Sequence, residues 1–99
     1  MPELEHLQAS AGQAAALLKA MSNPRRLLIL CMLCGTPGTS AGDLARATGL
    51  SPSATSQHLA RMREEGLIDS TREAQRILYF IKNDAVHQLI STLKSLYCP

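Results

Sequence analysis

Three cysteines are the residues of this chain best suited to chemistry. Cys31 and Cys34 stand three residues apart in an apolar stretch, and Cys98 is the penultimate residue. An odd number of thiols cannot form a closed disulfide framework on one chain. Any disulfide is therefore conditional. From the residues alone, Cys31 suits either a reversible redox role or simple packing, since a free cysteine behaves as a small apolar side chain.

Cys31 and Cys34 together spell a Cys-x-x-Cys motif, which occurs in thioredoxin-like enzymes and in zinc sites. The reactive pair of a redox enzyme lies at an exposed helix start after a strand, whereas this pair falls inside an apolar helix pattern. A structural zinc site needs further ligands, usually a second close pair. We therefore expect Cys34 to serve packing or an accessory role, and competition with Cys98 for an oxidised Cys31 remains an alternative.

Length and composition indicate how many domains carry these thiols and which partners suit the chain. We expect a single domain over residues 1–99, because a core of this size cannot be divided and remain stable. Only three residues are aromatic, which argues against a stacking platform for single-stranded nucleic acid. The net charge of +2 is compatible with DNA binding without requiring it.

The chain shows no apolar run long enough to span a bilayer, so no membrane partner is expected. Its first residues include Glu3 and Glu5 but no Lys or Arg, unlike the start of a secretory signal. We expect a cytoplasmic protein whose thiols are kept reduced.

Five helices are predicted from apolar periodicity and from the residues that begin and end helices. Asn23, Ser40, Ser51 and Asn83 are suited to cap the starts of four of them. The predicted helices cover about 7–21, 24–34, 41–48, 52–65 and 84–97.

The two short central helices are separated only by residues 49–51, which is the length and turn chemistry of a helix-turn-helix, about 41–65. Apolar, β-prone stretches at 67–68 and 77–81 flank a polar run, and predict a two-stranded β-hairpin with a charged tip, about 67–81. The predicted fold class is mainly α with a small β-hairpin, a winged helix-turn-helix.

The fourth helix carries the chemistry expected of a DNA-reading helix. Ser53, Ser56, Gln57 and Arg61 fall on one side, whereas the opposite side is mostly apolar and includes His58, which we expect to be packed. Glutamine can form two hydrogen bonds with an adenine edge, and arginine can reach guanine or phosphate. The alternative is an ordinary solvated helix face.

Arg72 and Arg76 stand near the hairpin tip, where a wing reaches the minor groove or flanking phosphates. The alternative is a hairpin that is merely soluble. Arg25 and Arg26, at the start of the second helix, suit either phosphate contact or surface cover.

With these elements in place, the chain resembles the ArsR family of bacterial repressors. The most specific stretches are residues 21–30 (MSNPRRLLIL) and 53–59 (SATSQHL), followed by 65–68 (EGLI). The resemblance implies a homodimer joined through the first and last helices, about 7–21 and 84–97, on an inverted-repeat DNA operator. The apolar stripes on those two helices supply surface for such an interface.

Many members of this family sense metals, and the resemblance can be tested on that point. The thiolate site of arsenic and cadmium sensors corresponds to residues 40–42, which contain no cysteine. The zinc site of other members, aligned at Asp84, would need ligands where Val86 and Tyr97 stand, and His87 is one residue out of register. We therefore expect neither metal site, and no cofactor.

Cys31 and Cys98 make the chain similar to the persulfide-responsive branch of the family. There the two equivalent cysteines of one subunit become linked by a disulfide or a longer sulfur chain, and repression is relieved. The resemblance thus implies redox sensing by Cys31 and Cys98, with reactive sulfur species as effector. A regulator that responds to a metal, haem or another thiol reagent remains an alternative.

Two other function classes fit the sequence less well. The sequence shows no phosphate-binding glycine loop, nucleophile elbow or paired catalytic carboxylates, so an enzyme is not expected. A winged-helix module that binds protein would need an acidic outward face on the fourth helix, where this chain has serines, Gln57 and Arg61.

Overall fold

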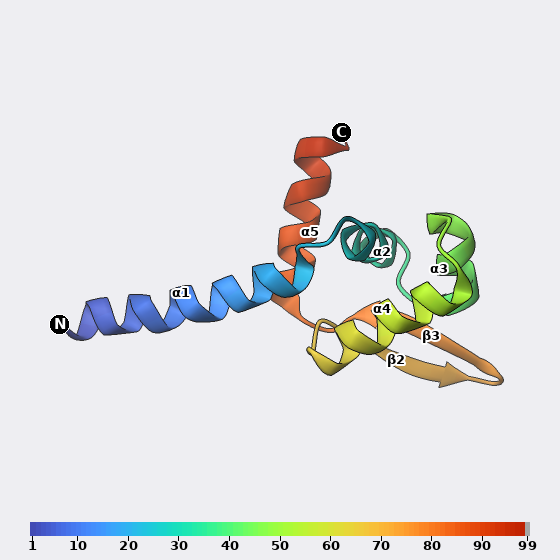
Figure 1. Ribbon diagram of the computed structural model, residues 1–99, viewed down its shortest axis with the longest axis horizontal. Coiled ribbons are helices and arrows are strands. Elements are labelled where there is room, and N and C mark those ends of the chain that lie inside the picture. Colours follow the sequence, from blue (N-terminus) through green and yellow to red (C-terminus); the bar gives the residue numbers. More distant parts are fainter. Residues whose placement is uncertain (99) are drawn as a thin grey trace.

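The computed structural model describes residues 1–98, which form five helices and three strands (Figure 1). Asparagine and serine side chains accept backbone N–H groups at the starts of four helices, as expected for N-caps. The elements in chain order are α1 (Pro2–Met21), α2 (Pro24–Gly35), β1 (Thr39–Ser40), α3 (Ala41–Thr48), α4 (Pro52–Glu64), β2 (Ile68–Glu73), β3 (Arg76–Ile81) and α5 (Asp84–Tyr97).

Helices α3 and α4 form the predicted helix-turn-helix. Gly49 ends α3 with a φ of 73°, a left-handed conformation that glycine adopts without steric cost. Ser51 then caps α4 through its hydroxyl, which accepts the N–H of Ala54. Glycine followed by a new cap therefore fixes the turn between the two helices.

The sheet differs from the prediction of two strands. Its order is β1-β3-β2, and both pairings are antiparallel. Strand β1 is two residues long, too short to show a period-two pattern, so only its pairing with Leu78 and Tyr79 identifies it. The polar run predicted as the hairpin tip is mostly strand, because β2 continues to Glu73 and leaves a two-residue turn.

The core lies between α2, α4, α5 and the base of the hairpin. Figure 1 shows α2 between α5 and α3, where it can pack on both. An aliphatic cluster fills this space, with Cys31, Cys34 and Tyr79 packed at its edge. Its buried members are Met21, Ile29, Leu30, Leu33, Leu44, Leu59, Met62, Leu67, Ile68, Val86 and Ile90.

Helix α1 begins five residues earlier than predicted and projects away from the remaining elements (Figure 1). Residues 1–16 are all exposed, including Leu7 at 64%. Only the last turns of α1 pack on the core, through Leu17, Ala20 and Met21. Most of the predicted apolar stripe of this helix is therefore uncovered. Within residues 1–98, no helix has both the length and the apolar character that crossing a membrane requires.

Candidate functional site

The two faces of α4 separate as the sequence predicted. Thr55, Leu59 and Met62 are almost completely buried, and Thr55 donates its hydroxyl hydrogen to the carbonyl oxygen of Ser51 at 2.9 Å. The exposed residues on the other face include Ser53, Ser56, Gln57 and Arg61. The helix therefore presents short polar groups and one cation to solvent, as a helix must to enter a major groove.

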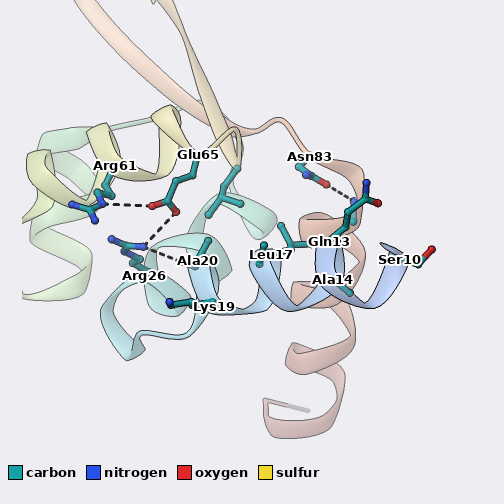
Figure 2. Close-up of a pocket in the computed structure, with 13 residues that line it drawn as sticks. Ser10, Gln13, Ala14, Leu17, Lys19, Ala20, Arg26, Arg61, Glu65 and Asn83 are labelled. Atoms are coloured by element: carbon teal, nitrogen blue, oxygen red, sulfur yellow. Dashed lines mark hydrogen bonds and ion pairs between the residues drawn. The ribbon is translucent and has the colours of Figure 1, made fainter. Parts of the chain in front are cut away.

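Arg61 is engaged within the chain, which the sequence did not predict. Its Nε lies 3.5 Å from Oε1 of Glu65, and the other carboxylate oxygen lies 3.6 Å from Nη1 of Arg26. Arg26 also donates from Nη1 to the carbonyl oxygen of Ala20. Figure 2 shows this chain of contacts beside an open groove that α1 also lines. Glu65 thus connects the recognition helix to the start of α2.

His58 lies on the packed side of α4, consistent with the predicted packing role. Burial, followed by the charges of Arg26 and then Arg25, lowers the pKa of His58 below its ordinary value of 6.5. A neutral imidazole is therefore favoured at neutral pH. Among the described residues, no group of three or more His, Cys, Asp or Glu is arranged to hold a metal ion.

The arginines of the wing are also held by neighbours. Arg72 donates from Nε to the carbonyl oxygen of Ala74, across the hairpin turn. Arg76 lies 3.1 Å from Asp43 of α3, which also pairs with Arg46. Hydrogen bonds from Ser40 and Arg46 lower the pKa of Asp43, so its carboxylate remains ionised. This carboxylate holds the first residue of β3, beside the hairpin turn, against the helix-turn-helix.

A second group of chemically active residues lies where α5 packs on α2. Cys31 is half-buried on α2, and Lys94 of α5 donates from Nζ to its carbonyl oxygen at 3.4 Å. Burial raises the pKa of Cys31, Lys94 opposes this effect, and the thiols of Cys98 and Cys34 add to it. Cys31 is therefore within electrostatic range of both other cysteines.

Cys34 is not enclosed by apolar atoms alone. Its Sγ lies 3.7 Å from Nε2 of His87 and 3.5 Å from Oγ of Ser91, both on α5. His87 was expected only to be out of register for a metal site, and its contact with Cys34 was not predicted. The spacing 87, 91, 94 and 98 was the available signal, because it places four polar or sulfur-bearing residues on one face of α5.

Cys98 is exposed immediately after the last turn of α5. Its backbone N–H donates to the carbonyl oxygen of Lys94 at 2.8 Å, which continues the helical bonding pattern by one residue. The described structure thus holds Cys98 against a helix end rather than in an unattached tail. All three cysteines are free thiols.

A helix-turn-helix with an exposed polar recognition helix, followed by an antiparallel hairpin, defines a winged helix-turn-helix DNA-binding protein. The family model described as "Bacterial regulatory protein, arsR family" matches residues 23–70. The chain is 77% identical over 99 residues to the HTH-type transcriptional regulator YgaV of Escherichia coli K12, covering the whole of both chains. The protein belongs to the ArsR family: it is a DNA-binding transcriptional regulator and not an enzyme.

Two solved structures extend this relationship. Reduced HlyU from Vibrio cholerae has a TM-score of 0.90 at 42% identity, over 96% of this chain and 99% of that chain. The transcriptional repressor BigR from Xylella fastidiosa has a TM-score of 0.87 at 31% identity, over 95% and 92%. Five helices and a small antiparallel sheet are thus shared across the family structures.

Proposed function

We propose that the protein is a homodimeric cytoplasmic repressor that leaves its operator when sulfur atoms link Cys31 to Cys98. The observation that carries this proposal is the packing of α5 on α2, which brings the thiols at positions 31 and 98 of the sequence into electrostatic range. The relatives support it: the BigR structure is that of a transcriptional repressor, and the HlyU structure is that of a reduced protein.

The DNA contacts in this proposal come from α4 and the wing. Ser53, Ser56 and Gln57 reach base edges or phosphates in the major groove, with Arg61 beside them. Arg72 and Arg76 contact flanking phosphates or the minor groove. Each wing arginine uses one nitrogen for a carbonyl or carboxylate group in the free protein, which leaves further N–H donors for DNA.

A homodimer accounts for the uncovered apolar side chains of α1 and α5. Leu4, Leu7 and Leu18 are exposed on α1, as are Leu96 and Tyr97 at the end of α5. A second copy that packs on these helices removes this surface from water. It also sets the spacing of two recognition helices on an inverted repeat.

The proposed switch is a pair of thiolate displacements. The Cys31 thiolate attacks an inner sulfur of a polysulfide and displaces hydrosulfide, and the Cys98 thiolate then displaces a second hydrosulfide from the bound chain. The intervening sulfur atoms stay in the bridge. The two thiols lose two protons and two electrons. The two terminal sulfur atoms of the polysulfide take up these electrons and leave as two molecules of hydrogen sulfide. A bridge of several sulfurs spans more than a disulfide, whose Cβ atoms must lie about 3.5–4.5 Å apart.

A link between α2 and α5 can affect the DNA-binding surface through the ion pairs of Glu65 with Arg26 and Arg61. Helix α2 carries Cys31, and its first turn carries Arg26, which pairs with Glu65 at the end of α4. A displacement of α2 relative to α5 therefore moves a partner of the recognition helix, and it also changes the dimer surface to which α5 belongs.

The test treats the reduced protein with inorganic polysulfide or with hydrogen peroxide, then measures operator binding and maps the links by mass spectrometry. Trypsin separates the Cys31 peptide (27–46) from the Cys98 peptide (95–99), and Cys34→Ser removes the third thiol without losing a polar group beside His87. A Cys31–Cys98 link with added sulfur and lost operator affinity at doses where peroxide has no effect supports the proposal. An unlinked protein with unchanged affinity refutes the switch, and equal potency of peroxide refutes the selectivity.

Cys31→Ser and Cys98→Ser complete the test, since each should bind the operator when reduced and stay bound after polysulfide treatment. Release of DNA from either variant would contradict the pairing. The direction of regulation needs a separate reporter assay, because the related HlyU of Vibrio cholerae is named a transcriptional activator.

A further inference from the structure

Lys94 forms hydrogen bonds with the backbone of both cysteines of the proposed switch. Its ammonium group donates to the carbonyl oxygen of Cys31, and its own carbonyl oxygen accepts the N–H of Cys98 at 2.8 Å. Lys94 and Cys98 are four residues apart, so they lie on the same side of α5. One residue thus joins the turn of α2 that carries one thiol to the turn of α5 that carries the other.

The Lys94 side chain also fills space over the C-terminal turn of α2. A Cβ atom added at Gly35 would lie 3.2 Å from Nζ of Lys94, so the ammonium group rests closely against this turn. The last carbonyl groups of a helix lack partners within the helix, and a cation there interacts favourably with the helix dipole. Lys94 is half-buried, so its position depends on the packing of α5 on α2 and also stabilises that packing.

The positive charge of Lys94 favours the thiolate form of Cys31, which is the nucleophilic form. Burial disfavours the Cys31 thiolate, and the neighbouring Cys98 and Cys34 thiolates disfavour it further. Lys94 is the one cation among the groups that act on the pKa of Cys31, which it lowers. Sulfur transfer proceeds through the thiolate, so this effect bears directly on the rate of the first displacement.

We infer that Lys94 is a positioning residue of the thiol switch: it holds the end of α5, with Cys98, against the Cys31 turn of α2 and stabilises the Cys31 thiolate. If the proposed function holds, the consequence is that Lys94 speeds and favours the link between Cys31 and Cys98. This part of the inference rests on the proposed function. The thiolate effect itself can be measured whether or not the link forms.

The experiment uses the full chain with Cys34→Ser, so that Cys31 is the one thiol of its tryptic peptide, 27–46. Lys94→Met removes the charge at similar length, and Lys94→Arg keeps the charge. Lys82→Met is the matched control, since Lys82 is exposed in the segment that precedes α5. The rate of Cys31 alkylation by iodoacetamide is followed against pH, peptide by peptide. In the Lys94→Met protein, the peptide that carries Cys98 becomes 83–99.

We expect Lys94→Met to shift the pH profile of Cys31 alkylation upward and to slow the reaction at pH 8 by about threefold, the effect of one partly screened charge. Lys94→Arg should restore the profile, and Lys82→Met should leave it unchanged. After polysulfide, the linked fraction should fall in Lys94→Met and recover in Lys94→Arg. If Lys94→Met lost the link because it unfolds, its melting temperature would fall. In that case Lys94→Arg would not restore the pH profile of Cys31 alkylation.

Identical alkylation profiles in Lys94→Met, Lys82→Met and the parent would overturn the inference. A parent that shows no link while Lys94→Met still shifts the Cys31 profile would instead refute the proposed switch and leave the electrostatic role of Lys94 supported. The two failures therefore give different results.

Discussion

Arg26 at the start of α2 and Glu65 just after α4 form an ion pair in which Nη1 and Oε2 lie 3.6 Å apart. The pair is mostly shielded, since the Arg26 side chain is 17% exposed. Glu65 also holds Arg61, so a single carboxylate serves an arginine beside the sensor helix and an arginine on the recognition helix. The Arg61 side chain remains 66% exposed, so Glu65 competes with DNA for Arg61 but does not shield it from DNA.

Glu65→Gln tests this shared contact. Loss of the carboxylate should lower the free energy of unfolding by about 1 kcal/mol, because Arg26 loses a partner for a charge that is largely out of water. Arg61 without its carboxylate partner should pair more fully with a phosphate, which would make the dependence of operator affinity on salt steeper by up to about one unit of slope. Denaturant unfolding and operator titrations at several salt concentrations measure the two effects.

Glu64→Gln is the matched control, because Glu64 is the exposed neighbour and has no ion-pair partner in the described part of the chain. It removes the same charge without freeing Arg61. If both variants change stability and salt dependence equally, net charge explains the result and the role given to Glu65 is wrong.

Gln57→Ala tests base reading by α4. Gln57 is exposed on the polar face and is free of the ion pairs that hold Arg61, so its removal should weaken operator binding by about tenfold or more, while binding to unrelated DNA stays nearly unchanged. Competition titrations with both DNAs measure the ratio. Arg61→Ala should instead weaken binding to both DNAs, since phosphate contact carries little sequence information. An undiminished preference for the operator in Gln57→Ala would contradict the assigned face.

Much of the fold was predictable because local chemistry fixes where four of the five helices begin. Asn23 and Asn83 cap α2 and α5 through side-chain oxygens, and such signals are local in sequence. The short strand β1 was not predictable, since its two residues are defined by pairing with a strand 38 residues later. The same holds for Glu65 between two arginines, a contact that no local pattern encodes.

The candidate site divides in the same way. The exposed face of α4 followed from helical periodicity alone, whereas the proximity of Cys31 to Cys98 was expected from family resemblance and not from spacing. Lys94 was missed entirely. Its significance comes from the packing of α5 on α2, which brings residues 63 positions apart into contact.

Leu7→Glu tests the proposed dimer. A carboxylate in place of this exposed leucine would have to be buried without a partner if α1 packs on a second copy, so the variant should sediment as a monomer where the parent is a dimer. Operator affinity should fall by at least about tenfold, because one recognition helix is lost. Gln8→Glu adds the same charge on a different side of α1 and should leave the dimer intact. A dimeric Leu7→Glu protein would place the interface elsewhere.

His58 gives the protein a dependence of stability on pH. Its pKa in the folded state lies below 6.5, because burial and the nearby Arg26 and Arg25 disfavour the imidazolium ion. The unfolded chain therefore takes up this proton first as the pH falls, and the free energy of unfolding should decrease from about pH 6.5 downward until the folded-state pKa is passed. Above about pH 7, the free energy of unfolding should no longer depend on the protonation of His58.

His58→Gln removes this titration while keeping a polar side chain, so the decrease in the free energy of unfolding between pH 7 and 5 should become smaller. Urea unfolding at closely spaced pH values measures it. His6→Gln is the control, because His6 is exposed on the projecting part of α1, and it should keep the parental dependence. If His58→Gln and the parent lose stability in parallel as the pH falls, another group takes up the proton, and the burial of His58 near the charges of Arg26 and Arg25 does not determine the acid sensitivity of the fold.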